Sequence, residues 1–335
     1  MDDHSRKLRV KKLEKKLFRS ESEVHTVEEN FWKRGCDSII YKGLFLTDGM
    51  LEYAIKRNWS VQRNNVKYII EIETLFNSKT VQINTDKKIQ VKKMYEMLCK
   101  ILSFECLYDG RFFDANSVVI DGEDHTAEIK EHLLSYYSGN KYYTKFSQPL
   151  NDTKYKSGFC AWERFDKKYR FMNQMYHYVG YGLGATADLR LALFSEIFEP
   201  LSEMLEEQHT IKVISTRLKK PNDPTFADKI RAVMIVYGVD TLFANDDIED
   251  VIKKTVNTRN KLLHVNVDKK ETLTGGECGF YIKKYVDMYR IILMKNLGIY
   301  SEDNQKELED SVKKFNENFP QLRIKKKRVC KKKTN

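Results

Sequence analysis

The apolar pattern of the chain is mainly strand-like in its N-terminal half and helical in its C-terminal half, and this change constrains the fold more than any other feature of the sequence. Between residues 37 and 82, the segments 38–46 and 66–76 are rich in β-branched and aromatic residues, and the short run 81–84 alternates apolar with polar residues. Such segments predict strands of an antiparallel sheet. From about Ala161 onward, apolar residues instead recur at helical spacing. We therefore predict an α+β protein, with a β-rich N-terminal module followed by an all-α helical bundle.

Four parts are expected along the chain. They are a basic helical or flexible segment over 1–34, a β-rich sensing or regulatory domain over 35–155, a helical domain over 156–318 and a basic disordered tail over 319–335. The first domain should include a helix near 88–102 that packs on the sheet, and short runs at 112–113 and 118–120 suggest further strands. Short connections between antiparallel helices predict an up-and-down bundle in the second domain.

Composition excludes some classes of protein. No run approaches the ~20 consecutive apolar residues that span a bilayer, and no apolar segment follows the basic N-terminus. We therefore expect a cytoplasmic protein that does not contact membranes. The six cysteines are scattered without a Cys-x-x-Cys pair, so a zinc site is not expected and free thiols are.

Positive charge is concentrated at the two ends. The net charge is +11, of which residues 321–335 contribute +8 and residues 1–20 contribute +5, so the body between them is near neutral. Such ends can bind phosphates without regard to sequence, with an affinity that falls steeply with salt. They can equally be solubilising, disordered segments. The sequence leaves both interpretations open.

Arg259 is the residue whose position most needs an explanation. A helix is expected to begin near Asp247, with caps offered by 245–247, and to close within the stretch 258–266. On a helical wheel its apolar residues share one arc, and Arg259 falls near the middle of that arc. Because arginine cannot lose its charge, burial there requires a carboxylate, a phosphate or a water-filled cleft. The plainer interpretation is a helix end at which Arg259 forms a structural ion pair and His264 lies near the terminal carbonyls.

The motif around Arg259 and the segments on either side of it resemble a known protein family. Arg259-Asn260, followed after three residues by His264 at the end of an amphipathic helix, resembles the catalytic motif of HEPN-domain ribonucleases. A short helix near 226–230 precedes it, and Leu273-Thr274 and a final Leu297-Gly298-Ile299 follow. This order resembles the ApeA-like HEPN family and covers roughly the C-terminal half of the chain.

The resemblance implies a specific chemistry. It implies RNA cleavage without a metal or cofactor, at a site shared between the two protomers of a homodimer. His264 would serve as general base or acid for attack by the ribose 2′-OH, Arg259 would bind the scissile phosphate, and Asn260 would orient His264 or hold a phosphate oxygen. The family also implies an acidic residue on an early helix, for which Glu199 is preferred over Glu196. The basic residues expected to bind RNA are Lys261, Lys325, Lys326, Lys327 and Arg328.

The resemblance also implies a biological setting. Prokaryotic members resemble abortive-infection effectors in anti-phage defence, in which the N-terminal module would sense a phage-derived or regulatory trigger or restrain the nuclease. The alternative is a non-catalytic HEPN-like module that binds RNA or a nucleotide, in which Arg259 is only structural. A third class is a nucleic-acid-binding protein that acts through its basic ends.

Two further segments invite a chemical interpretation. Residues 121–125, with Glu128 and His132, carry oxygen and imidazole groups that a divalent cation could use, but an acidic turn after a strand explains them better. Residues 136–146 interleave aromatics with lysines, as in single-strand binders, although a hairpin with a Gly-Asn turn is favoured. We also expect one helix over 189–205, kinked by Pro200.

Overall fold

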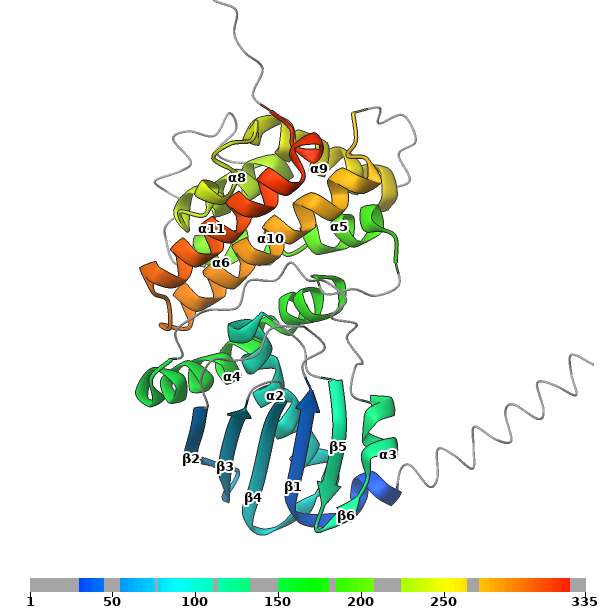
Figure 1. Ribbon diagram of the computed structural model, residues 1–335, viewed down its shortest axis with the longest axis vertical. Coiled ribbons are helices and arrows are strands. Elements are labelled where there is room, and N and C mark those ends of the chain that lie inside the picture. Colours follow the sequence, from blue (N-terminus) through cyan, green and yellow to red (C-terminus); the bar gives the residue numbers. More distant parts are fainter. Residues whose placement is uncertain are drawn as a thin grey trace, which may run out of the picture. The chain divides into compact units, whose positions relative to one another are not determined.

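The computed structural model describes residues 30–44, 55–75, 78–110, 114–132, 150–180, 185–207, 224–263 and 271–325. The chain divides into two compact units. The first contains the strands and the second contains most of the helices, which confirms the predicted α+β organisation (Figure 1).

The first unit is built on a six-stranded sheet. Its strands are β1 (Gly35–Leu44), β2 (Ile55–Arg63), β3 (Val66–Leu75), β4 (Ser78–Gln90), β5 (Asp114–Ile120) and β6 (Glu123–Asp124), in the order β2-β3-β4-β1-β5-β6. The pairs β2·β3, β3·β4, β1·β4 and β5·β6 are antiparallel. Strand β2 was not expected, although its turn carries a sequence signal. Asn64 and Asn65 both adopt positive φ, as a two-residue hairpin turn of type I′ requires.

Helix α2 (Val91–Asp109) follows directly after β4, and its apolar side is buried. Met94, Leu98 and Ile101 have no exposed surface, and the same is true of Ile83 and Ile39 on the sheet. The expected helix near 88–102 is therefore present and extends by two further turns. Burying five such side chains contributes on the order of 1.5–3 kcal/mol each before the entropy of ordering is subtracted.

The acidic segment after β5 is held by local hydrogen bonds. An Asp121 side-chain oxygen accepts the backbone N–H groups of Asp37 and Ser38, both at 3.0 Å. Asp124 accepts the N–H of Thr126 at the start of α3 (Thr126–His132). The segment therefore acts as a turn and helix cap, as the plainer interpretation expected. The aromatic and lysine-rich segment 136–146 lies outside the described residues.

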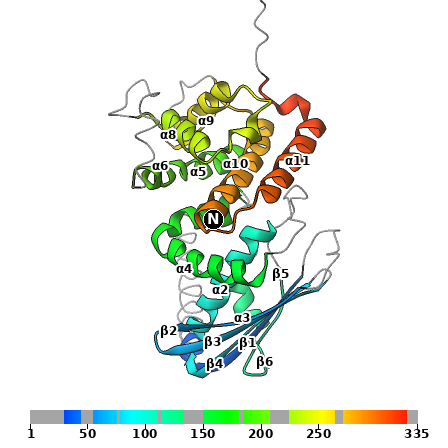
Figure 2. The ribbon, with the colours of Figure 1, turned by 90° about the vertical axis from the view of Figure 1, so that its left-hand side faces the viewer.

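The second unit is a bundle arranged around one buried helix. Helix α10 (Gly275–Asn296) has buried residues along nearly its whole length, and α11 (Glu302–Asn318) runs beside it in both views (Figures 1 and 2). The other described helical segments of this unit are α4 (Asp152–Gln174), η1 (Met175–Gly180), α5 (Ala187–Ser195), α6 (Phe198–Glu207), α8 (Phe226–Val236), η2 (Asp240–Phe243), α9 (Ile248–Leu263) and η3 (Pro320–Leu322). Helix α11, capped by Ser301, was not expected.

Two boundaries differ from the sequence expectation. Helix α4 begins at Asp152 rather than near Ala161, because the Asn151 side chain caps it by accepting the N–H of Lys154. The expected domain boundary at 155/156 therefore falls inside a helix. The single helix expected over 189–205 is two helices, α5 and α6, separated at Glu196 and Ile197. None of the described helices has the length and apolar character needed to cross a membrane.

Candidate functional site

Arg259 lies on α9 and is held by an acid and an aromatic ring. Its Nη2 donates to Glu196 Oε2 at 3.1 Å, and its Nε donates to the other carboxylate oxygen, so the contact is a two-pronged fork. The guanidinium carbon lies 4.2 Å from the centre of the Phe226 ring. The arginine and glutamate side chains keep 14% and 24% of their surface exposed. The guanidinium orientation is therefore set by Glu196 and Phe226, on a side chain that keeps part of its surface open to solvent.

Pro200 explains why Glu196 lies at this position. Proline has no N–H to donate to the carbonyl four residues earlier, and its ring clashes with that carbonyl, which here belongs to Glu196. The chain accordingly turns at Glu196 and Ile197, and α6 begins at Phe198. Glu196 thus follows the end of α5, which packs along α9. The break that was expected as a kink places a carboxylate against Arg259.

Glu199, the acid preferred from the sequence, has a different partner. Its carboxylate forms an ion pair with Lys229 of α8, with 35% and 24% of the two side chains exposed. Of the two carboxylates that the sequence left open, Glu196 is the one that contacts Arg259. The pairing of Glu199 with Lys229 was not anticipated from the sequence.

The other predicted site residues are placed as follows. Asn260 adjoins Arg259, and its Oδ1 accepts from Arg259 Nη1 at 3.3 Å. Lys261 is exposed on the last turn of α9, and Lys325 is exposed at the end of the described chain. Lys325 is thus described, whereas Lys326, Lys327 and Arg328 lie outside the described residues, as does His264.

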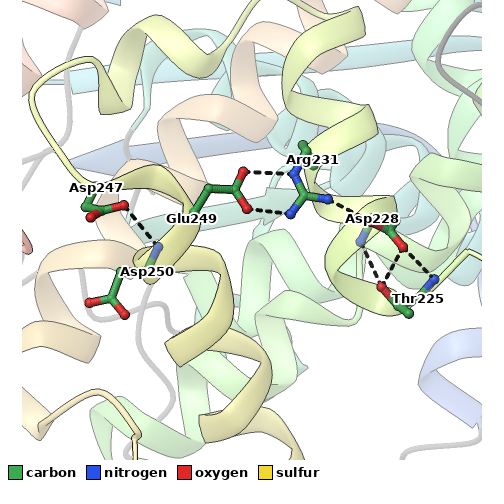
Figure 3. A network of polar contacts seen from close by, with 6 residues as sticks. All are labelled: Thr225, Asp228, Arg231, Asp247, Glu249 and Asp250. Carbon is green, nitrogen blue, oxygen red and sulfur yellow. Dashed lines mark hydrogen bonds and ion pairs between the residues drawn. The ribbon is translucent and has the colours of Figure 1, made fainter. Parts of the chain in front are cut away.

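An arginine clamp joins α8 to α9 (Figure 3). Arg231 of α8 donates from Nε and Nη2 to the carboxylate of Glu249 on α9, at 2.9 and 2.6 Å, and from Nη1 to Asp228 at 2.7 Å. These hydrogen bonds, first of all those to Glu249, raise the pKa of Arg231. Asp228 also completes a capping box with Thr225 at the start of α8. The clamp fixes the helix that carries Phe226 against the helix that carries Arg259.

The C-terminal part of α9 is fastened to α10 and to the segment before it. Thr255 and Tyr285 share a buried hydrogen bond of 3.0 Å. Thr258 Oγ1 donates to the carbonyl of Lys254 and accepts the N–H of Leu273 at 3.0 Å. Thr274 then starts α10 with a capping box completed by Glu277. The residues of α9 just before Arg259 are therefore fixed to α10 and to the segment that precedes it. Arg259 projects from a helix that is held in place.

This arrangement has a defined chemical capacity. A guanidinium that makes a fork with a carboxylate has the geometry to make the same fork with a phosphate. Within the described residues, no group of three or more histidine, cysteine, aspartate or glutamate side chains is placed to hold a metal ion. The structure thus brings together Arg259, Asn260 and Glu196. It adds Phe226, which sequence reasoning missed because an aromatic at the start of a helix usually belongs to the core.

Comparison with known proteins gives a family match, which covers the helices around Arg259. The model of the Apea-like HEPN family matches residues 135–303, which is half of the chain and includes α5, α6, α8, α9 and α10. No curated protein and no solved structure gave a match. The matched region contains Arg259, Asn260, His264, Glu196 and Glu199. The chain therefore belongs to the Apea-like HEPN family, which supports a nuclease-type or RNA-related function.

Proposed function

We propose that the protein is a metal-independent endoribonuclease of the HEPN type that cuts RNA by attack of a ribose 2′-OH on the adjacent phosphodiester. The observation that carries the proposal is the preoriented Arg259 guanidinium. It is held in a fork by Glu196, rests on the Phe226 ring and is partly exposed, in the region that the family model matches. A phosphate that displaces the carboxylate meets a planar donor that is already aligned, so little orientation entropy is lost on binding.

The chemistry follows from the residue types. As general base, His264 accepts the proton of the 2′-OH while the oxygen attacks phosphorus. The 5′-oxygen leaves and takes a proton from the histidine of the partner protomer or from water. Histidine titrates near neutral pH, which suits both steps, and such assistance commonly contributes ~100- to 10,000-fold in rate. Arg259 neutralises the negative charge that develops on the phosphate oxygens, and Asn260 orients the pair. The products are a 2′,3′-cyclic phosphate and a 5′-hydroxyl.

The wider role has several parts. The working unit is a homodimer that brings two Arg259 and His264 pairs together across a two-fold axis. Lys261, Lys325 and the following basic residues bind the RNA backbone. The β-rich first unit senses a phage-derived or regulatory trigger, and RNA cleavage in the cytoplasm then arrests an infected cell. The assignment of Glu196 to Arg259, in place of Glu199, follows the contacts on the described helices.

One observation favours the second candidate function, a non-catalytic RNA- or nucleotide-binding module. The fork from Glu196 already compensates the charge of Arg259, as a purely structural ion pair does. In such a module, Arg259→Ala lowers stability and His264→Ala changes nothing.

The test is cleavage of a labelled single-stranded RNA in EDTA by the full-length protein. The variants Arg259→Ala and His264→Ala are compared with the wild type, and the all-deoxy strand controls for the 2′-OH. The matched control is Arg164→Ala, which removes an exposed arginine of α4, a helix that carries none of the candidate site residues. The proposal expects cutting of RNA alone, by the wild type and Arg164→Ala only. Equal cutting by all four proteins, or cutting of the DNA strand, contradicts it.

A further inference from the structure

Two cation–carboxylate pairs lie in parallel at the candidate site. Glu196, in the turn between α5 and α6, comes three residues before Glu199 in the first turn of α6, and Phe226 and Lys229 are three residues apart on α8. Glu196 and Phe226 both contact Arg259. Glu199 and Lys229 contact each other. Residues three apart on a helix lie one above the other, with about 5–6 Å between their Cβ atoms. On α8, Lys229 therefore lies about one helical turn from Phe226, the residue whose ring contacts the Arg259 guanidinium.

The Lys229 pair differs from the structural ion pairs of the same unit. The buried pair between Lys284 and Asp246 has no exposed surface on either side chain. In contrast, the Lys229 and Glu199 side chains are 24% and 35% exposed, more than those of Arg259 and Glu196. An ion pair with this exposure contributes only about 0–1 kcal/mol, so an incoming anion can replace its carboxylate at little cost.

Resting on the proposed function, we propose that Lys229 is a second substrate-binding residue that contacts the RNA phosphate next to the one bound by Arg259. Glu199 holds the ammonium in place in the free protein and is displaced when RNA binds. A lysine suits this position because a compact ammonium with three donors accepts a phosphate from several directions, whereas the fork of Arg259 fixes the scissile one. Two cations at one site favour a polyanionic strand over a single phosphate.

The test measures RNA affinity as a function of salt, separately from cleavage. Full-length protein is titrated against a fluorescent single strand in which 2′-fluoro replaces every 2′-OH, so that attack by a 2′-oxygen cannot occur. For a single strand, the slope of log affinity against log salt becomes shallower by about 0.7 for each phosphate that the protein no longer neutralises. We expect Lys229→Met to lower the slope by about that amount and to weaken binding most at low salt.

Two other variants separate binding from a structural role. Glu199→Gln removes the competing carboxylate and should strengthen RNA binding, whereas a structural role predicts that Glu199→Gln and Lys229→Met weaken it alike. The matched control is Lys253→Met, which removes a lysine of α9 that is also paired with a glutamate, Glu271. Its slope should equal that of the wild type, because Lys253 lies six residues before Arg259 on the helix.

Each outcome decides the inference. An unchanged slope in Lys229→Met, or weaker binding in Glu199→Gln, overturns it, as does wild-type binding with no salt dependence. Cleavage of ordinary RNA by the same proteins is scored separately. If the wild type cuts RNA but the slopes of Lys229→Met and wild type coincide, only the Lys229 assignment fails. If nothing cuts but the slopes behave as expected, Lys229 binds RNA and the nuclease proposal fails instead.

Discussion

Removing Asp246 should destabilise the helical unit by leaving a lysine charge buried without its partner. Lys284 of α10 and Asp246 both have no exposed side-chain surface and form an ion pair, and Arg323 donates to the same carboxylate at 3.2 Å. The Lys284 ammonium is also 4.8 Å from the centre of the Phe280 ring. In Asp246→Asn the shape is kept and the negative charge is lost. Breaking a buried pair in this way typically costs about 3–5 kcal/mol.

Lys284 can release its proton instead of staying charged. The free-energy cost of the unpaired charge therefore cannot exceed the cost of deprotonating Lys284, and that cost depends on pH. Burial lowers the pKa of Lys284 from 10.5, even with Asp246 present. From that reference value, holding the lysine neutral costs about 1.36 kcal/mol per pH unit, or about 4.8 kcal/mol at pH 7 and about 2 kcal/mol at pH 9. Between the lowered folded pKa and 10.5 the unfolded chain binds more protons, so stability rises with pH. The cost of Asp246→Asn should therefore shrink from pH 7 to pH 9.

Urea denaturation at the two pH values measures this cost. The matched control is Asp250→Asn on α9, which breaks the part-exposed 3.3 Å pair with Lys254 and should cost below about 1 kcal/mol at either pH. The double variant Asp246→Asn, Lys284→Met removes the unpaired charge and should recover part of the stability. The reasoning is refuted if Asp246→Asn costs no more than Asp250→Asn, or if its cost does not fall at pH 9.

Three further predictions test the fold and the site. Gly110→Ala should destabilise the protein by about 2–4 kcal/mol in thermal unfolding, because φ is +67° and a Cβ would lie 2.8 Å from the buried Arg290 guanidinium; an unchanged melting temperature contradicts this. Thr274→Ala should lower the free energy of unfolding by about 1 kcal/mol because the cap of α10 is lost. Thr274→Ser should keep most of the stabilisation that the cap provides. Phe226→Leu should lower kcat/KM for RNA cleavage roughly 2- to 10-fold by releasing the face of Arg259, with Phe226→Tyr close to wild type; equal rates in all three exclude that role.

Local features could be predicted from the sequence where neighbouring residues decide the structure. Alternation and β-branching predicted strands near 38–46, 66–76 and 81–84, and helical spacing predicted α9 with its cap region. The capping box of α10 needs only Thr274 and Glu277, which are three residues apart. Where the pattern was weak, prediction failed. Strand β2 alternates polar residues with few apolar ones, and the largely polar α11 has only a narrow apolar side.

The candidate site shows most clearly how far the structure can be predicted from the sequence. The sequence by itself determined that Arg259 lies on an apolar arc of a helix and needs a compensating anion, because a 3.6-residue period fixes which face a side chain occupies. Only the tertiary structure decided which anion meets it, since Glu196 is 63 residues away in the chain. The choice between Glu196 and Glu199 depends on how far α5 and α6 are rotated and shifted along α9. Packing of side chains from distant segments sets that rotation and shift, and no periodicity within one helix records it.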